Sequence, residues 1–269
     1  MRRLHLFELE DQAWFPSTIR DLATDYLHFM QKAAGMHRGM LPFIEEALKE
    51  GRTTHIVDLC SGGTGPVPAI VEDLRARGLP VTATLTDLYP NTRALEQAKA
   101  ASGGAIGFVV RPIDARALPA NLTGVRTLFN GFHHFRPADA QAILCDAAAA
   151  RQPIAIFEVS RRSAAMILPV LLVPLFVLLA TPFVKPFRWK RVFWTYVVPL
   201  VPLTCLWDGI VSQLRAYTVA ELREMAATAG AMTWRADDPR VFRSGARMTY
   251  LLGWPALSEH DGRRVEGRD

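Results

Sequence analysis

The sequence predicts an α/β fold, a doubly wound and mostly parallel sheet with helices on both faces. Three observations predict it: strands and helices alternate from residue 54 onward, the strands are almost entirely apolar, and glycines cluster directly after the first strand in "VDLCSGGTGP" (57–66). Strands that are apolar on both faces are typical of a parallel sheet covered by helices on each side. Outside this core, we expect an N-terminal helical cap and an apolar helical insertion after the fifth strand.

The helical cap comes first in the chain. Residues 17–34 carry apolar side chains at helical spacing, with Ser17 as the expected N-cap, and a second helix is predicted over 41–50. In the alternating region, strands are predicted at 54–60, 81–87, 106–114, 125–132 and 153–160. The helices between them are predicted at 66–78, about 91–101 and 137–151. A late helix (216–230) and a strand containing "MTYLLGW" (248–254) complete the sheet.

Length and composition set the class of protein. The chain has 269 residues, half of them hydrophobic, and a formal net charge of +5. We divide it into a cap, a cofactor-binding core, an insertion, a completion of the core and a polar tail expected to be disordered: 1–50, 51–160, 161–207, 208–257 and 258–269. The three cysteines cannot all pair within the chain, which favours a reduced, cytoplasmic protein. The start is basic but carries acids at Glu8, Glu10 and Asp11 and lacks the apolar run of a secretory signal, and the basic residues form no stripe that would indicate a nucleic-acid partner.

The glycine-rich stretch lies where such sheets bind ligands, beyond the carboxyl ends of the strands. Asp87 closes the next strand, 22 positions after Gly65, and an acid at that distance suits the hydroxyl groups of a ribose. Pro68 stands where a dinucleotide fingerprint has its third glycine, and the Gly-Lys-Ser/Thr of a P-loop is absent. Asp58, before a loop without basic residues, favours a ligand with a positive charge, such as the ammonium group of an amino acid. A structural alternative is that Asp58 only caps the loop.

Taken together, "VDLCSGGTGP", "LTDLYP", "RPIDARALP" and "LFNGFHHF" resemble, in their order and spacing, the class I S-adenosylmethionine-dependent methyltransferases. The resemblance covers residues 50–160 and 208–253 and implies a Rossmann-like core with S-adenosylmethionine as cofactor and no metal. It implies that Asp87 binds the ribose and Asp114 the adenine amine. The full set of implied cofactor residues is Asp58, Cys60, Ser61, Gly62, Gly63, Gly65, Asp87, Leu88, Asp114, Ala115 and Asn130. Cys60 stands where the family more often has glycine, and we expect it to be a small buried filler.

The end of the fourth strand faces the methyl group in this fold, and it carries His133 and His134. Histidine is the side chain most easily poised as a base near neutral pH. Two adjacent histidines cannot both point into one pocket from regular structure, so we expect one of them to line the site. Asn130 is not followed by the Pro-Pro-aromatic sequence of the methyltransferases that act on nucleic acids or glutamine, which argues against those substrates.

The stretch after the fifth strand is unusually apolar. Residues 164–184 are uncharged and would be roughly 31 Å long as a helix, enough to span a bilayer. The basic segment 185–191 follows, and then a second apolar run, interrupted by Pro199 and Pro202, to residue 207. A two-span hairpin would carry the basic segment across the membrane against the positive-inside tendency. The sequence therefore favours proline-bent helices on a membrane surface; a lid over the substrate, a dimer interface and a true span stay open.

These observations predict a methyltransferase that acts on a hydrophobic or lipid-like small molecule at a membrane surface, in the cytoplasm or on the inner face of the membrane. The residues expected at the substrate are Trp14, Tyr26, Glu158 and Tyr217. Two alternatives are a methyltransferase for a small thiol or hydroxyl metabolite, with the apolar segment as its lid, and a non-catalytic module that binds the cofactor or a membrane. The acceptor atom and the oligomeric state stay open.

Overall fold

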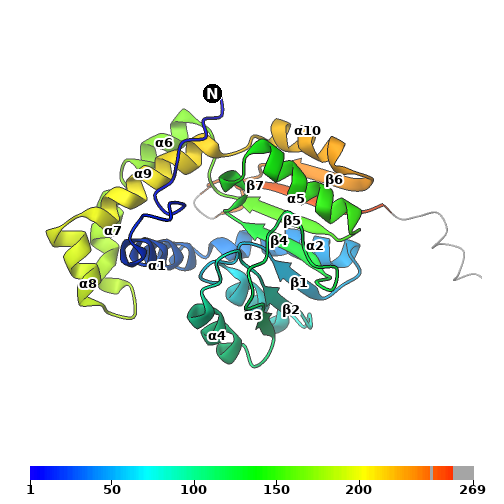
Figure 1. Ribbon diagram of the computed structural model, residues 1–269, viewed down its shortest axis with the longest axis horizontal. Coiled ribbons are helices and arrows are strands. Elements are labelled where there is room, and N and C mark those ends of the chain that lie inside the picture. Colours follow the sequence, from blue (N-terminus) through cyan, green and yellow to red (C-terminus); the bar gives the residue numbers. More distant parts are fainter. Residues whose placement is uncertain (243–244, 257–269) are drawn as a thin grey trace, which may run out of the picture.

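The computed structural model describes residues 1–242 and 245–256, and it contains a seven-stranded sheet with helices on both faces (Figure 1). The strand order is β3-β2-β1-β4-β5-β7-β6, with β1 to β5 parallel and β7 antiparallel to both of its neighbours. This confirms the predicted Rossmann-like α/β fold with a mostly parallel sheet. The tail predicted at 258–269 lies outside the described residues.

The first five strands are shorter than predicted, since their last predicted residues leave the sheet, whereas the last strand has the predicted length. The strands are β1 His55–Asp58, β2 Thr82–Leu85, β3 Ile106–Phe108, β4 Val125–Phe129, β5 Ile154–Glu158, β6 Met232–Asp237 and β7 Thr249–Pro255. The third strand, predicted to reach residue 114, ends at Phe108. The helices packed on the sheet are α2 Leu41–Glu50, α3 Val67–Ala76, α4 Thr92–Ala101, α5 Pro137–Ala149 and α10 Val219–Ala229.

A separate layer of helices stands beside the sheet (Figure 1, left). It comprises α1 Ser17–Ala33, α6 Ala164–Val170, α7 Val173–Ala180, α8 Trp189–Val192 and α9 Leu200–Arg215, with a short turn at η3 Thr181–Phe183 and a π-helical η4 Phe193–Val197. Two further short turns connect elements of the chain, η1 Met36–Gly39 between α1 and α2 and η2 Phe132–His134 between β4 and α5. The apolar core of the helical layer joins Ile19, Leu22 and Tyr26 of α1 to Val177 of α7 and Val201 of α9. The boundary predicted at residue 207 falls inside α9, which runs without a break.

The insertion helices leave a large apolar surface uncovered. Ala164–Phe183 is long and apolar enough to cross a membrane, with a mean hydropathy of 2.6, and 22% of its most apolar window is buried in the protein. The segments Trp189–Val197 and Leu200–Arg215 pass the same test together but are bent by 73°. A buried apolar lid would have most of these side chains covered, so this part of the insertion does not fit that alternative.

The first 16 residues form an extended arm that follows α9 (Figure 1). Leu4 N–H donates to the Leu214 carbonyl, and the Trp207 indole donates to the Phe7 carbonyl. The prediction that Ser17 caps the following helix is wrong: Pro16 is the N-cap of α1, and no side chain caps that end. Proline fits there because its fixed φ suits the entry to a helix and its missing N–H has no helical partner to lose.

Candidate functional site

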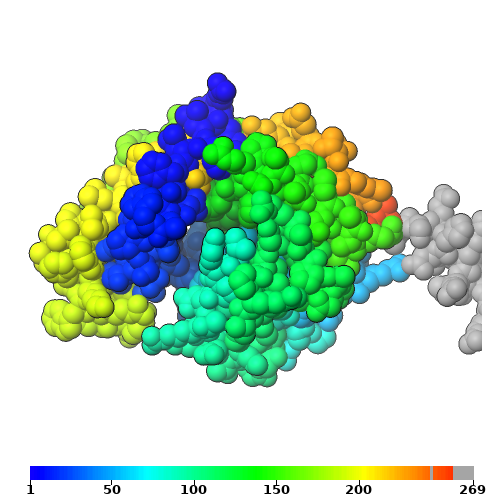
Figure 2. Space-filling model, viewed as in Figure 1, coloured from blue at the N-terminus to red at the C-terminus, as the bar shows by residue number. Residues whose placement is uncertain are grey.

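A cleft of about 900 Å³ lies between the helical layer and the carboxyl ends of β1 and β2, seen in Figure 2 as the hollow between the blue arm and α1 and the sheet side of the molecule. Six segments line it: the arm, α1, the glycine loop (59–66), the loop between β2 and α4, the start of α4 and the loop before α8. The helical layer and the sheet thus each supply one wall of the cleft.

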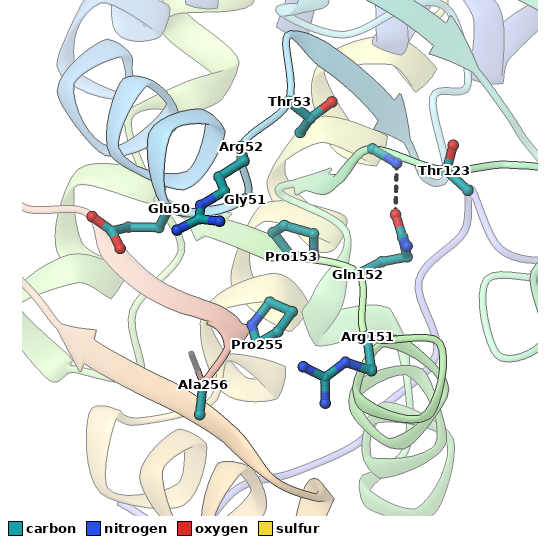
Figure 3. A pocket seen from close by; sticks show the side chains of 11 residues that line it. Glu50, Gly51, Arg52, Thr53, Thr123, Arg151, Gln152, Pro153, Pro255 and Ala256 are labelled. Carbon is teal, nitrogen blue, oxygen red and sulfur yellow. Dashed lines mark hydrogen bonds between the residues drawn. The ribbon is translucent and has the colours of Figure 1, made fainter. Parts of the chain in front are cut away.

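A smaller cavity of about 360 Å³ lies at the opposite edge of the sheet (Figure 3). Thr53, Gly124 and Pro153, which precede β1, β4 and β5, line it. The Gln152 side chain fills part of its wall and accepts a hydrogen bond from Gly124 N–H (2.8 Å). Because ligands of parallel α/β sheets bind at the carboxyl ends of the strands, the larger cleft is the candidate site.

Two glycines of the glycine loop, Gly62 and Gly65, have open space beside their backbone, and Gly62 and Gly63 line the cleft. Gly62 and Gly65 have φ values of +50° and +52°, and within the described chain no atom lies within 4 Å of the place where a Cβ would stand. At Gly63 a Cβ would lie 2.9 Å from Cε1 of His28, which reaches over from α1. Gly62 and Gly65 leave bare backbone for a ligand, and Gly63 lets α1 approach the loop.

Asp58 lies beneath this loop and ties it to the sheet. Its Oδ2 accepts a hydrogen bond from Ser61 Oγ, and its Oδ1 accepts one from Thr127 Oγ1 in β4, both at 2.6 Å. Burial raises the pKa of Asp58 to about 7, although the two hydroxyl donors oppose this shift. Asp58 therefore holds the loop in its turn, as the structural alternative expected. Its contact with a cofactor stays a prediction, as does that of Ser61.

Asp87 is placed beside the glycine loop, as expected of a ribose ligand. Its Oδ2 accepts a hydrogen bond from Gly62 N–H and its Oδ1 one from Tyr89 N–H, both at 2.7 Å. A carboxylate has about four acceptor positions, so each oxygen keeps one for a ligand hydroxyl. Leu88, between the two, is exposed at the rim.

The predicted adenine residues are partly committed to other contacts. Asp114 accepts a forked pair of hydrogen bonds from Arg116, which also bonds Asp139 at 2.7 Å. The hydrogen bond from Arg116 lowers the pKa of Asp114 below its usual value. Ala115 next to it is buried in the sheet's core. Contact with adenine stays a prediction for both.

Two residues with left-handed backbone flank the site. Cys60 is an exposed residue with φ +56°, so the expectation of a buried filler is wrong. Asn130, at φ +49°, accepts a hydrogen bond from Val159 N–H through its Oδ1 (2.8 Å). Asn130 thereby joins the ends of β4 and β5 at the edge of the site.

His133 and His134 are turned toward the arm and do not belong to the lining of the cleft. His133 is 3% exposed, and its Nδ1 lies 2.6 Å from Oε2 of Glu158. His134 Nδ1 lies 2.9 Å from Oδ1 of Asp11, an arm residue that does line the cleft. The structure thus brings the predicted bases together with the predicted acid Glu158, behind the cleft wall.

Five residues form a charged cluster between the arm and the core: Glu8, Asp11, His133, His134 and Arg215. The Arg215 guanidinium lies 2.6 Å from Asp11 and 3.4 Å from Glu8. Burial disfavours the charged imidazole of His134, but the hydrogen bond to Asp11 and the charge of Glu8 outweigh it and raise its pKa to about 9. Glu8, His133 and His134 could offer three atoms to a metal ion within 4.8 Å of one another. Since Arg215 already balances Glu8, we interpret the cluster as the ion pairs that hold the arm.

The predicted substrate residues lie outside the cleft lining. Tyr26 is 4% exposed and buried in the helical layer, whereas Trp14 is 68% exposed on the arm. Glu158 accepts hydrogen bonds from the backbone at Phe132 and from His133. Tyr217 donates to the Phe135 carbonyl beneath the arm. Sequence reasoning missed the residues that do line the cleft from the arm and α1, chiefly Glu10, Asp11, Asp25 and His28.

Comparison with known proteins supports the fold alone. No protein-family model and no curated protein matches the chain. Among solved structures, the plantazolicin methyltransferase BpumL in complex with SAH matches with a TM-score of 0.52 and 11% identity over 92% of this chain and 94% of its own. An O-methyltransferase family 2 protein from Planctomyces limnophilus in complex with apigenin matches at 0.51 and 13%, over 92% and 68%.

A third match is a protein of Nostoc punctiforme assigned to the O-methyltransferases, with a TM-score of 0.50 and 13% identity. It covers 94% of this chain, which spans 64% of the Nostoc protein, less than two thirds of its length. At these identities the likeness establishes a shared fold. The chain has the fold of the class I S-adenosylmethionine-dependent methyltransferases.

Proposed function

We propose that this protein is an S-adenosylmethionine-dependent methyltransferase of small molecules. The observation that carries the proposal is the pairing of a glycine loop that is open at Gly62 and Gly65 with the carboxylate of Asp87, at the ligand-binding edge of a class I methyltransferase fold. These residues fit a nucleoside with a small, positively charged tail. S-adenosylmethionine, when bound, supplies an electrophilic methyl group on a sulfonium.

Calorimetric titration with S-adenosylhomocysteine tests the cofactor. We expect one molecule to bind per chain, with no heat from NAD or FAD under the same conditions. Binding of a nicotinamide or flavin nucleotide instead would contradict the proposal, because the cleft would then be built for a pyrophosphate.

The methyl acceptor we propose is a hydrophobic or lipid-like small molecule. The apolar insertion supports this, since a polar metabolite would have no need of such a surface beside the cleft. Incubation with methyl-labelled donor and an extract of lipids and metabolites, followed by mass identification of the labelled product, tests the acceptor class. Labelling confined to water-soluble products would contradict it.

The site of action we propose is the cytoplasmic face of a membrane. Between residues 164 and 207 there is no acidic residue. The exposed apolar side chains of α6, α7, the turn between them and η3 include Leu168, Leu172, Leu175, Leu179 and Phe183. Exposed aromatics and the basic residues Lys185 and Lys190 follow, a combination that suits the acyl–headgroup boundary of an anionic bilayer.

The packing of the helical layer favours one leaflet over a full span. Val177 and Ala180 of α7 pack against α1 and α9, and α1 itself lines the cleft. A helix drawn through the bilayer would have to leave these partners. Pro186 and Arg188 line the cleft, while Phe187 and Trp189, their neighbours in the chain, are 59% and 78% exposed. The mouth of the cleft therefore borders the proposed membrane surface.

Flotation with anionic phospholipid vesicles tests this placement. We expect the wild-type protein to float with the vesicles and the double variant Phe187→Ser, Trp189→Ser to stay behind, because two of the most exposed aromatic side chains are lost. The matched control is Leu79→Ser, Val110→Ser, which removes two exposed apolar side chains on the sheet side of the molecule. A protein that forms a stable dimer and never floats would assign the apolar surface to self-association and overturn the membrane proposal.

A further inference from the structure

Glu10 lies on the arm and lines the cleft, and one of its carboxylate oxygens forms no hydrogen bond with the described residues. Its Oε1 is buried, and in the part of the chain that the structure describes it has no hydrogen-bond partner. The backbone around it is fixed, since the N–H groups of Leu9 and Glu10 donate to the two carboxylate oxygens of Asp208, at 2.6 and 3.1 Å. The Glu10 side chain is thus held on the cleft wall by contacts that do not use its carboxyl group.

The other buried or half-buried acids near this wall have partners. Asp11 pairs with His134 and Arg215, and Asp25 pairs with Arg191 at 2.6 Å. An unpaired polar atom out of contact with water is costly, and it is rare in native proteins unless a ligand completes it. A hydrogen donor carried by the ligand of the cleft would complete Glu10.

The groups that face Glu10 make it a weak acid. Asp208 of α9 and Glu8 and Asp11 of the arm are negative, and His134 of η2 is the opposing positive charge; Cys205 of α9 is also near. Burial first, and then the charge of Asp208, raise the pKa of Glu10 to about 8. A base with such a pKa works best near neutral pH, which is the tuning that proton transfer needs.

We propose that the Glu10 carboxylate, through the oxygen that is not closed off inside the protein, accepts the hydrogen of an acidic hydroxyl group, a phenol or an enol, on the methyl acceptor. The inference rests on the proposed function and names its base. The hydroxyl oxygen forms a bond to the methyl carbon while the bond from that carbon to sulfur breaks and its electron pair stays on sulfur. The hydroxyl proton passes to the Glu10 carboxylate. The products are a methyl ether, a neutral thioether and a neutral carboxylic acid, so charge and atoms balance.

The class of hydroxyl follows from base strength and charge. A phenol loses its proton near pH 10, as tyrosine does, about two units above the Glu10 carboxyl, whereas an aliphatic alcohol is a far weaker acid. Acidic neighbours disfavour an acceptor that already carries a carboxylate. His133 is excluded from this role in the present conformation, because it does not line the cleft and its Nδ1 is engaged by Glu158.

The contact is tested by measuring the affinities of 2-naphthol and naphthalene in the presence of S-adenosylhomocysteine, with the fluorescence of each probe as the signal. The two probes differ by the hydroxyl group. We expect wild type at pH 8, where the Glu10 carboxyl is partly charged and His134 still holds the arm, to prefer naphthol on the order of tenfold, the gain of a hydrogen bond to a charged acceptor. Glu10→Ala should lose this preference, and Glu72→Gln, an exposed glutamate on α3, should keep it. A preference unchanged in Glu10→Ala, or no naphthol binding to wild type, would overturn the inference.

The pH profile of methyl transfer separates a base from a mere hydrogen-bond acceptor. With 2-naphthol as acceptor, or with the hydroxyl compound labelled in the extract, kcat of wild type should rise with pH through about 8. Glu10→Gln keeps an acceptor oxygen, so KM should stay within a few-fold while kcat falls about 100-fold and loses the rise near pH 8. Equal kcat profiles for the two proteins would overturn the role as base.

The cofactor titration keeps this test independent of the proposed function. S-adenosylhomocysteine should bind wild type, Glu10→Gln and Glu10→Ala with the same affinity, because Glu10 lies on the wall opposite the glycine loop. If it binds none of them, the proposed function fails. If it binds all of them and the naphthol preference survives in Glu10→Ala, only the inference about Glu10 fails.

Discussion

At the scale of single residues, Asp87 joins the loop after β1 to the loop after β2. Both of its oxygens accept backbone hydrogen bonds, one of them from Gly62, and a ribose would use the remaining acceptor positions. We therefore predict that Asp87→Ala weakens binding of S-adenosylhomocysteine by about 10- to 100-fold, the loss of one or two hydrogen bonds to a charged acceptor. Calorimetry measures this, with Glu72→Gln as control. Equal affinities would remove Asp87 from the site.

Gly63 and His28 make a second residue-scale prediction. A Cβ at Gly63 would lie 2.9 Å from Cε1 of His28, so the ring must move when Gly63 is replaced. We expect Gly63→Ala to lower the free energy of unfolding by about 1 kcal/mol in wild type and by much less in a His28→Ala background. Urea unfolding of the four proteins of this cycle measures the coupling. Additive effects would mean that α1 does not press on the glycine loop.

The sequence predicted the residues of the site that lie in one local motif, and it missed those brought there by distant parts of the chain. Asp87 could be placed because its spacing from the glycine loop follows from one β-α-β unit. Glu10 could not, since its position depends on Asp208, 198 residues away. For the same reason one of the two histidines after β4 was expected in the pocket: nothing local shows that the arm brings Glu8 and Asp11 against them.

At the scale of elements, the arm is held to the core largely through His134 and Arg215. The pKa of His134 is raised from 6.5 to about 9, so its ion pair with Asp11 stabilises the docked arm fully below about pH 6.5. This contribution is lost as the pH rises through 9. We predict that hydrogen-exchange protection of arm residues 3–11, corrected for intrinsic rates, falls between pH 7 and 10.

The variant His134→Gln tests whether the charge of His134 is the cause. In this variant, hydrogen-exchange protection of the arm should be low and should not change between pH 7 and 10. His37→Gln is the matched control, since His37 pairs with Asp73 on the far side of the glycine loop. If the arm of wild type stays equally protected at pH 10, another contact holds it and the assigned role of His134 is wrong.

Most helices and strands could be predicted from the sequence, whereas the extent of α9 could not. Pro199 and Pro202 were interpreted as bends within a second apolar helix that ends at residue 207. In the structure Pro199 is the N-cap of α9 and Pro202 lies in its first turn, where a missing N–H costs nothing. The helix continues to Arg215 because its second half is anchored by contacts of Ser212 and Arg215 to the arm that no periodicity reveals.

At the scale of the whole molecule, the helical layer has two distinct faces. Through α1 and the arm it forms one wall of the cleft, and through α6, α7 and η4 it presents the exposed apolar surface. Removal of residues 164–207 would take away α7 and half of α9, and it would strip the partners from Ile19, Leu22 and Tyr26. Such a deletion would unfold the cleft wall as well, so only point substitutions can separate membrane binding from catalysis.

The charge of the surface gives the most specific prediction about the membrane. Lys185 and Lys190 are exposed beside the apolar face, and each basic residue at an anionic surface contributes about 1 kcal/mol. We predict that Lys185→Glu, Lys190→Glu lowers the partition onto anionic vesicles on the order of tenfold or more, and that the difference shrinks at high salt. Binding to neutral vesicles, which rests on Phe187 and Trp189, should change little. S-adenosylhomocysteine affinity should be equal in both proteins, since neither lysine lines the cleft. Equal partition at every salt concentration would show that headgroup charge has no part in docking.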